Sequence, residues 1–341
     1  MPLDVTGRTI LITGGTGSFG STMVRRLLSQ DVAQVRILSR DETKQDDMRR
    51  AVADARARFY VGDIRDYGSV AEAMRGVDLV FHAAALKQVP SCEFFPAQAV
   101  LTNVNGSAHV IEAAAAAGVS VVVCLSTDKA VYPVNAMGMT KALMEKTAQA
   151  FARNNPGSAT TVAIVRYGNV LYSRGSVIPL FIEQLKAGRP LTITDPRMTR
   201  FLMSLADSID LVEYAFANAA PGDTFVRKAP ASTVQDIALA VAEILGKKPE
   251  LKIIGTRHGE KLYETLLSRE ERALAEDRGP YFRVPLDARS LDYGLYFDQG
   301  DSHQGETDDY TSHNTERLDV EGVVALLRRL PEIAQSKGAG A

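Results

Sequence analysis

The chain has 341 residues, of which 45% are hydrophobic and 23% are charged, and its formal net charge at pH 7 is −2. These values argue against intrinsic disorder, and the lack of net positive charge argues against nucleic acid or an anionic membrane as partners. The two cysteines, Cys92 and Cys124, belong to no Cys/His cluster, so neither a disulfide framework nor a metal site is expected.

The first half of the chain alternates short β-branched runs with Ala-rich helical stretches. Apolar strands separated by helices are typical of a parallel sheet that helices cover on both faces, so we expect a doubly wound α/β fold. No signal peptide and no apolar run long enough to span a bilayer is visible, which predicts a cytoplasmic protein. The strands are expected at residues 9–13, 35–39, 58–62, 79–83, 119–125 and 161–166.

Beyond about residue 171 the pattern loosens and predicts a smaller α/β domain at the carboxyl edge of the sheet, where such folds bind ligands. We expect residues 1–171 mainly in the first domain and 172–330 mainly in the second, with part of 200–230 returning to the first. The Asp- and Tyr-rich segment 290–317 predicts a solvated arm, with a lid or a subunit contact as alternatives. The end, 331–341, is expected to be a flexible tail.

The first strand runs into a glycine-rich turn, Thr13-Gly14-Gly15-Thr16-Gly17-Ser18-Phe19-Gly20, and a helical stretch at 22–29 follows. At the start of a βαβ series this run is typical of dinucleotide binding. Glycine lets the backbone approach the pyrophosphate, and the helix N-terminus faces its charge. The residues expected to contact the dinucleotide here are Gly14, Thr16, Gly17, Ser18, Phe19 and Gly20.

The end of the second strand predicts which dinucleotide is bound. An NAD-selective protein usually presents an acidic residue there, whereas Ser39 and Arg40 suit the 2′-phosphate of NADP, with Lys44 assisting. Asp41 keeps NAD as the alternative. The other residues expected to contact the cofactor follow the third and fourth strands, and they are Asp63, Ile64, Ala83, Ala84 and Ala85.

The fifth strand ends in Ser126-Thr127-Asp128-Lys129. A carboxyl acid beside an amine base at a strand end favours proton abstraction next to a carbonyl, although the pair is also compatible with an exposed salt bridge. His82, at the end of the fourth strand, is interpreted as a packed strand histidine. Lys87 follows it and suits either a phosphate contact or a solvated position.

Together with Lys141, the glycine-rich run and the 126–129 tetrad resemble the extended short-chain dehydrogenase/reductase family. Further strings are similar to its polysaccharide-biosynthesis branch, which contains inverting UDP-N-acetylglucosamine 4,6-dehydratases. The resemblance implies a Rossmann fold with a nucleotide-sugar-binding domain, a UDP-sugar substrate and a homo-oligomer. The strings are Arg166-Tyr167-Gly168-Asn169-Val170, Met198-Thr199-Arg200-Phe201 and Arg257-His258-Gly259-Glu260-Lys261-Leu262-Tyr263-Glu264.

The resemblance also implies roles for single residues. The sequence departs from the family where a tyrosine is expected one helical turn before Lys141, because Met137 stands there. Capsule-type relatives are similar in this respect, and Tyr132 is the candidate replacement, although packing is the favoured role for it. The implied catalytic residues are Thr127, Asp128, Lys129 and Lys141, the last of which also binds the cofactor. The implied substrate-binding residues are Lys87, Asn169, Arg174, Val177, Arg200, Arg257 and Glu260.

In the implied reaction, hydride leaves C4 of the sugar for NADP, Lys129 removes the C5 proton and Asp128 protonates the departing C6 hydroxyl. Hydride then returns to C6, and reprotonation from the opposite face inverts C5. The alternative is a UDP-glucose or UDP-N-acetylglucosamine 4-epimerase, a name that some relatives carry, which needs no acid or base beside C5 and C6. A third hypothesis is an inactive NADP-binding module, which Met137 favours and the nucleotide-sugar motifs oppose.

Overall fold

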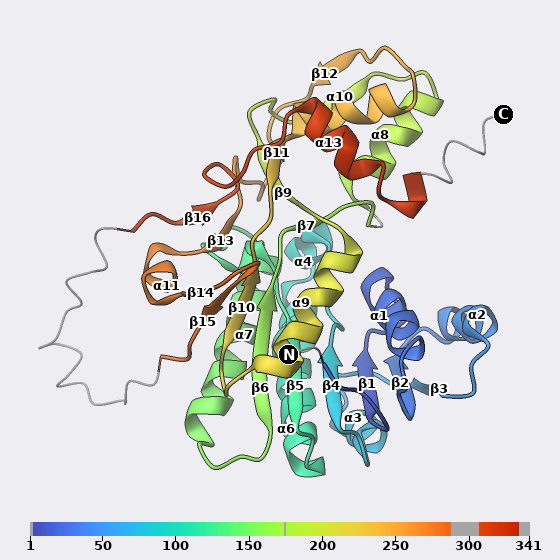
Figure 1. The fold of residues 1–341 in the computed structure, drawn as a ribbon, viewed down its shortest axis with the longest axis vertical. Helices are drawn as coiled ribbons and strands as arrows, with labels where there is room; N and C mark the ends of the chain where they lie inside the picture. Colours follow the sequence, from blue (N-terminus) through green and yellow to red (C-terminus); the bar gives the residue numbers. More distant parts are fainter. Residues whose placement is uncertain (1–2, 174, 288–306, 334–341) are drawn as a thin grey trace, which may run out of the picture.

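The computed structural model describes residues 3–173, 175–287 and 307–333. The expected site residue Arg174, most of the expected arm at 290–317 and the tail from 334 onward lie outside the described residues. Figure 1 shows a twisted sheet with helices packed beside it and a second group of elements above one end of the strands.

A nine-stranded sheet forms the centre of the fold, in the order β14-β15-β10-β6-β5-β4-β1-β2-β3. In this order the strands from β10 to β3 are parallel to one another. At the other edge β15 pairs antiparallel with β10, and β14 pairs antiparallel with β15. The α/β class is confirmed, and the strands expected in the first half lie within two residues of their predicted bounds. The bounds are β1 (Thr9–Thr13), β2 (Gln34–Ser39), β3 (Ala57–Val61), β4 (Leu79–His82), β5 (Val121–Leu125), β6 (Thr161–Arg166), β10 (Thr224–Arg227), β14 (Glu276–Arg278) and β15 (Tyr281–Val284).

Helices cover both faces of the parallel part. Alternate side chains of β1 point to opposite faces: Ile10 and Ile12 pack with Met23 of α1, whereas Leu11 packs with Val110 of α6. Since both faces are buried, the strands are apolar throughout, as the sequence pattern requires. The helices are α1 (Ser18–Leu28), α2 (Glu42–Val52), α3 (Tyr67–Met74), α4 (Val89–Phe94), α5 (Pro96–Ala99), the π-helix η1 (Val100–Asn105), α6 (Gly106–Ala117), the short η2 (Asp128–Ala130), α7 (Ala136–Asn154) and α9 (Leu205–Asn218).

The order of the strands locates the ligand site. The chain builds outward through β1, β2 and β3 and then returns to place β4 on the other side of β1. At such a reversal the connections after β1 and β4 leave in different directions, so a crevice opens at their carboxyl ends.

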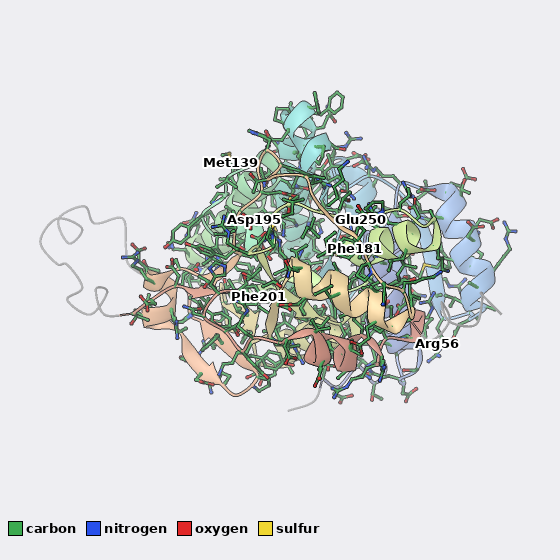
Figure 2. The ribbon with its side chains drawn as sticks, turned by 90° about the horizontal axis from the view of Figure 1, so that it is seen from above. Arg56, Met139, Phe181, Asp195, Phe201 and Glu250 are labelled. Carbon is green, nitrogen blue, oxygen red and sulfur yellow. The ribbon has the colours of Figure 1, made fainter. Side chains whose placement is uncertain are left out.

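A second core lies above this edge. Helices α8, α10 and α13 pack against one another, and Figure 2 shows them side by side from above with Phe181 among them. Phe181 is fully buried, so this group has an apolar interior of its own. Its elements and their neighbours are β7 (Asn169–Val170), α8 (Val177–Lys186), β8 (Leu191–Ile193), β9 (Thr199–Met203), β11 (Ala231–Thr233), α10 (Val234–Ile244), β12 (Leu251–Ile253), β13 (Thr265–Leu267), α11 (Arg269–Leu274), β16 (Tyr310–Thr311) and α13 (Val320–Leu327).

The chain passes between the two groups more than once. Helix α9 packs on the main sheet and β10 pairs within it, so part of 200–230 returns to the first group. Strands β14 and β15 then extend the same sheet, so residues 276–284 return to it as well. The second return was not expected, because Glu276–Arg278 is a charged edge strand without apolar alternation. Among the described helices, none has the length and apolar character that crossing a membrane requires.

Candidate functional site

A hollow of ≈ 380 Å³ opens at the carboxyl ends of β1, β2, β3 and β4. Asp41, which keeps NAD as the alternative, is among its lining residues, and sequence reasoning missed two others, Leu38 and Thr102. Thr102 comes from the π-helix η1, and its Oγ1 is buried without a hydrogen-bond partner in the described structure. The predicted cofactor residues that line the hollow are Gly14, Thr16, Ser39, Arg40, Lys44, Asp63, Ile64, Ala84 and Ala85.

The glycine turn fits a dinucleotide phosphate. Gly14 has φ +67°, and a Cβ there would lie 2.8 Å from the Cα of Ala84, so the turn after β1 and the end of β4 meet without side-chain atoms between them. Helix α1 begins at Ser18 rather than at the expected residue 22, because Gly17 is its N-cap. No side chain caps this helix and its first turn holds no acidic residue, so its N–H groups are available to an anion.

Phe19 has a different surrounding from the other residues of the turn. Its ring stacks on Tyr167 at 5.6 Å between centroids and lies 5.2 Å from Phe81. The side chain therefore packs on the sheet and is partly buried there.

The residues after β2 are already engaged with one another. Asp41 is the N-cap of α2, where it accepts from the backbone N–H of Lys44, and it also forms an ion pair with the Lys44 side chain, which lowers its pKa. Arg40 lies 3.5 Å from Asp63 and about half of its side chain is exposed. The acidic residue that would favour NAD thus has a structural role as a helix cap, although both it and Arg40 line the hollow.

The catalytic residues expected after β5 form a tight group. Thr127 is the N-cap of η2 and donates to Asp128 Oδ1 at 2.7 Å, and Lys129 Nζ lies 3.0 Å from the same oxygen. Asp128 is fully buried, and its Oδ2 has no partner in the described structure. An unpaired buried carboxylate oxygen is costly in a folded protein and indicates a ligand or a reacting group.

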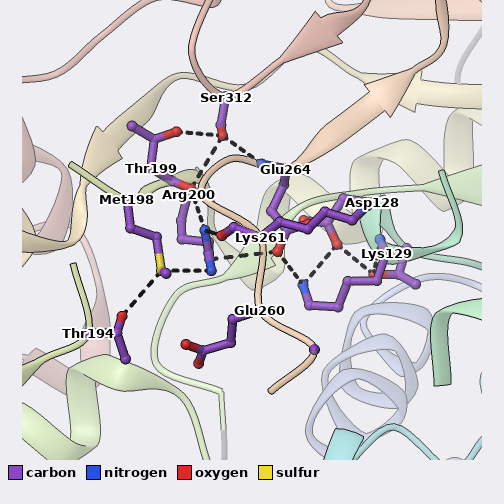
Figure 3. Close-up of polar contacts among 12 residues, drawn as sticks. Asp128, Lys129, Thr194, Met198, Thr199, Arg200, Glu260, Lys261, Glu264 and Ser312 are labelled. Atoms are coloured by element: carbon purple, nitrogen blue, oxygen red, sulfur yellow. Dashed lines mark hydrogen bonds and ion pairs between the residues drawn. The ribbon is translucent and has the colours of Figure 1, made fainter. Parts of the chain in front are cut away.

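Glu264, the residue before β13, joins this group, although its place in the sequence predicts no role for it. Its Oε1 lies 3.5 Å from Lys129 Nζ and 3.7 Å from Arg200 Nε, its Oε2 has no partner among the described residues, and only 3% of it is exposed. Figure 3 shows Asp128, Lys129 and Glu264 converging with Lys261 beside them. Burial lowers the pKa of Lys129, but attraction to Asp128 and Glu264 outweighs it and the pKa is raised.

Lys141 lies on α7 and reaches the same strand end. Its Nζ donates to the carbonyl of Leu125 at 2.7 Å, and burial lowers its pKa to about 8. Met137, one turn earlier, is buried with Cys92 and Ala99, so its side chain does not stand in for a tyrosine hydroxyl.

The candidate replacement for the missing tyrosine, Tyr132, is half exposed and has φ +47°. Its hydroxyl donates to Asp309 at 3.1 Å. Another expected non-catalytic group, His82, is fully buried between Thr13 and Ser107, and burial lowers its pKa to about 3. His82 is therefore neutral, as expected for a packed strand histidine.

Two of the residues implied for the nucleotide-sugar, Asn169 and Val177, lie on β7 and at the start of α8. Asn169 stands on β7 with a buried Oδ1 that lacks a partner in the described chain. Val177 is the first residue of α8, whose N-cap Ser176 makes no capping bond and has an unpartnered Oγ. The side chain of Val177 packs on the second core. What Val177 offers at the N-terminus of α8 is therefore its backbone.

Arg200, Glu260 and Arg257 come from two separate segments. Arg200 donates to the carbonyls of Thr199 and Lys261, which holds its guanidinium next to Glu264. Glu260 accepts from the backbone N–H of Arg257 at 3.2 Å, whereas the side chain of Arg257 is exposed. Lys87 is likewise exposed. The structure thus brings Arg200 to the group formed by Asp128, Lys129 and Glu264, and leaves Arg257 and Lys87 at the surface.

Comparison with known proteins gives the family. A family model described as polysaccharide biosynthesis protein matches residues 10–286, and one for its C-terminal part matches 287–334. The chain belongs to the polysaccharide-biosynthesis branch of the extended short-chain dehydrogenase/reductases. A UDP-glucose 4-epimerase of Rickettsia akari is 55% identical over 96% of this chain and 97% of its own length.

Two solved structures extend the comparison. Pen from Bacillus thuringiensis is 34% identical, with a TM-score of 0.87 over 96% of this chain and 99% of its own. The dTDP-glucose 4,6-dehydratase DesIV of Streptomyces venezuelae, solved with NAD bound, is 27% identical, with a TM-score of 0.69 over 74% of this chain and 86% of its own. This branch member is therefore a nucleotide-sugar-modifying enzyme.

Proposed function

We propose that this enzyme is a UDP-sugar 4,6-dehydratase, acting on UDP-N-acetylglucosamine with inversion at C5. The observation that carries the proposal is the buried group of Asp128, Lys129 and Glu264, whose two unpartnered carboxylate oxygens lie at the carboxyl end of β5. An enzyme that only moves hydride at C4 has no need of such a group. A dehydratase needs an acid and a base beside C5 and C6.

The first half of the reaction relies on the cofactor and on Lys141. When bound, the nicotinamide would supply a hydride acceptor for C4 and a hydride donor for C6. Lys141 supplies a buried amine whose pKa, about 8, lies near neutrality, so it can accept the proton of the C4 hydroxyl or hold positive charge beside the oxygen. This assigns to Lys141 part of the work that the family tyrosine performs, since Met137 offers no hydroxyl.

The second half relies on the Asp128 and Lys129 pair, with roles that the charges suggest. The raised pKa of Lys129 keeps it an ammonium, which donates a proton to the departing C6 hydroxyl to form water. The free Oδ2 of Asp128 is then the base that takes the C5 proton. This reverses the roles expected from the sequence, where Lys129 was the base, because two carboxylates next to one amine favour its charged form.

The cofactor is proposed to be NADP. Support comes from Arg40 and Ser39 in the lining of the hollow and from the structural use of Asp41 as the N-cap of α2. A 2′-phosphate would meet the exposed guanidinium of Arg40, which now faces Asp63. DesIV has NAD bound, so NAD is the competing assignment.

The second candidate is a UDP-glucose 4-epimerase. The name of the relative from Rickettsia akari supports this activity better than the dehydratase. In that case the keto sugar turns over, hydride returns to C4, and Asp128 and Lys129 form only an ion pair. An inactive cofactor-binding module is the weakest hypothesis, because it has no use for unpartnered groups beside a diphosphate site.

Product analysis in deuterated water decides between the two reactions. The purified enzyme is incubated with UDP-N-acetylglucosamine and, separately, UDP-glucose, and products are identified by NMR. We expect a 4-keto-6-deoxy product with solvent deuterium at C5. Asp128→Asn and Lys129→Met should each lose turnover by about 10²-fold or more while still binding the cofactor. A 4-epimer without solvent deuterium, formed at full rate by both variants, would establish the epimerase instead.

A further inference from the structure

Four side chains, three of them buried, form a hydrogen-bonded chain behind the strand end that precedes Asp128. Ser126 Oγ donates to Glu145 at 2.5 Å, and Arg166 holds both oxygens of Glu145 at 2.8 and 2.5 Å. The same guanidinium holds both oxygens of Glu271 at 2.7 and 2.8 Å. Ser126, Glu145 and Arg166 are each at most 4% exposed, so breaking one bond leaves a buried polar group unsatisfied.

One end of this chain holds the strand that carries Asp128. Lys141 and Glu145 lie one turn apart on α7, and they bind consecutive residues at the end of β5. Lys141 donates to the carbonyl of Leu125, and Glu145 accepts from the hydroxyl of Ser126. The position of α7 therefore sets the position of the strand end.

The other end of the chain reaches the segment that carries Glu264. Glu271 closes the capping box of α11 with Ser268, and Arg166 donates to the carbonyl of Leu266 at 3.2 Å. Leu266 lies in β13, two residues after Glu264. The carboxylate of Glu264 faces Lys129. The same guanidinium thus fixes both segments that meet in the catalytic group.

Glu145, with Arg166 as its counter-ion, also contributes to the charge around Lys141. The titratable groups that face Lys141 are His82 on β4, Cys124 on β5 and Glu145 on α7. Burial leaves His82 uncharged, with a pKa of about 3, and raises the pKa of Cys124 to about 12, so both are neutral near pH 7. Glu145 is then the negative charge among these groups that favours the ammonium form of Lys141.

We propose that Glu145 is a positioning residue that, held by Arg166, fixes the strand end bearing Asp128 and supplies the negative charge facing Lys141. The proposal rests on the proposed function only in taking Asp128 and Lys141 as groups that act on the sugar. The geometry of the network is independent of which sugar is bound and of whether the product is dehydrated or epimerised.

Glu145→Gln tests the proposal, with Asp223→Asn as its matched control. Asp223 is also a buried carboxylate, whose two oxygens accept from Nε and Nη2 of Arg283, but it joins β15 to the turn before β10 and not to the catalytic group. The first readout is the pH dependence of acylation of Lys141 in the cofactor-free protein, followed by peptide mass spectrometry. We expect the midpoint to fall by about one pH unit in Glu145→Gln and to stay unchanged in Asp223→Asn.

The second readout is turnover, where Glu145→Gln should lower kcat by about 10-fold or more with KM within about 2-fold. An unchanged labelling midpoint, or an equal loss of kcat in Asp223→Asn, would overturn the proposal. Because labelling requires no substrate, it gives an answer even if the enzyme turns over none of the tested UDP-sugars.

Ser126→Ala probes the same link without changing a charge, and it serves if Glu145→Gln does not fold. It should lower kcat and leave the labelling midpoint where it is. If both variants fold, the double variant should lose less than the product of the two separate losses, since both break one contact. Independent, multiplicative losses contradict a positioning role for this bond.

Discussion

The carboxylate of Glu264 lies 3.5 Å from the ammonium of Lys129. Among the ion pairs of the described residues, the other carboxylate beside this ammonium is that of Asp128, at 3.0 Å. The contact joins the second half of the chain to the strand end of the first. It also places two negative charges on one amine, which is why the pKa of Lys129 is raised in spite of burial.

Glu264→Gln should lower the pKa of Lys129, because one of the two carboxylates that favour its ammonium form is removed. If the ammonium is the acid in the reaction, the alkaline limb of the kcat profile moves to lower pH and turnover falls by about 10-fold or more. The control is Glu213→Gln, which removes a carboxylate paired with Arg26 on another part of the fold. A pH profile identical to that of the unmodified enzyme contradicts this role for Glu264.

Lys141→Met should change how stability depends on pH. The pKa of Lys141 falls from 10.5 to about 8 on folding, so between these pH values the unfolded chain binds more protons and the free energy of unfolding rises with pH. The variant lacks this rise, and at neutral pH it should be more stable by up to about 3 kcal/mol, less about 1 kcal/mol for the lost bond to Leu125. Urea unfolding from pH 7 to 10.5 measures both curves, and parallel curves disprove the shift.

Arg40→Asp should weaken NADP binding far more than NAD binding, because a contact to the 2′-phosphate becomes a repulsion. The matched control is Arg65→Ala. Arg65 also pairs with Asp63, at 2.6 Å, but does not line the hollow. Calorimetric titration of both dinucleotides gives the ratio of affinities. Equal affinity of the unmodified protein for NADP and NAD refutes the NADP assignment.

Gly14→Ala and Gly7→Ala separate backbone strain from close approach. Both glycines have φ +67°, but a Cβ at Gly7 meets nothing within 4 Å, whereas one at Gly14 lies 2.8 Å from the backbone of Ala84. Gly7→Ala should cost about 1 to 2 kcal/mol of unfolding free energy, the usual penalty of a left-handed backbone. Gly14→Ala should cost more and also reduce cofactor binding. Denaturant unfolding compares the two, and equal costs show that the approach to Ala84 is unimportant.

The sequence by itself determined the parallel sheet, the glycine turn and the strand end at Asp128. These features depend on neighbours along the chain: continuous apolar runs specify strands buried on both faces, and the strand-turn-helix order gives the glycines their meaning. The predicted cofactor residues that line the hollow follow from the same logic, because the carboxyl ends of parallel strands share one edge.

The tertiary structure alone decided which distant groups meet at that edge. Nothing near Glu264 in the sequence indicates that it pairs with Lys129, and the motif around Arg166 does not show that its guanidinium binds Glu145 and Glu271. Charged side chains carry no periodic signal, and a partner is chosen by burial, where an unpaired charge is costly. The protonation states that set the proposed roles of Lys129 and Lys141 therefore appeared only once the segments were packed together.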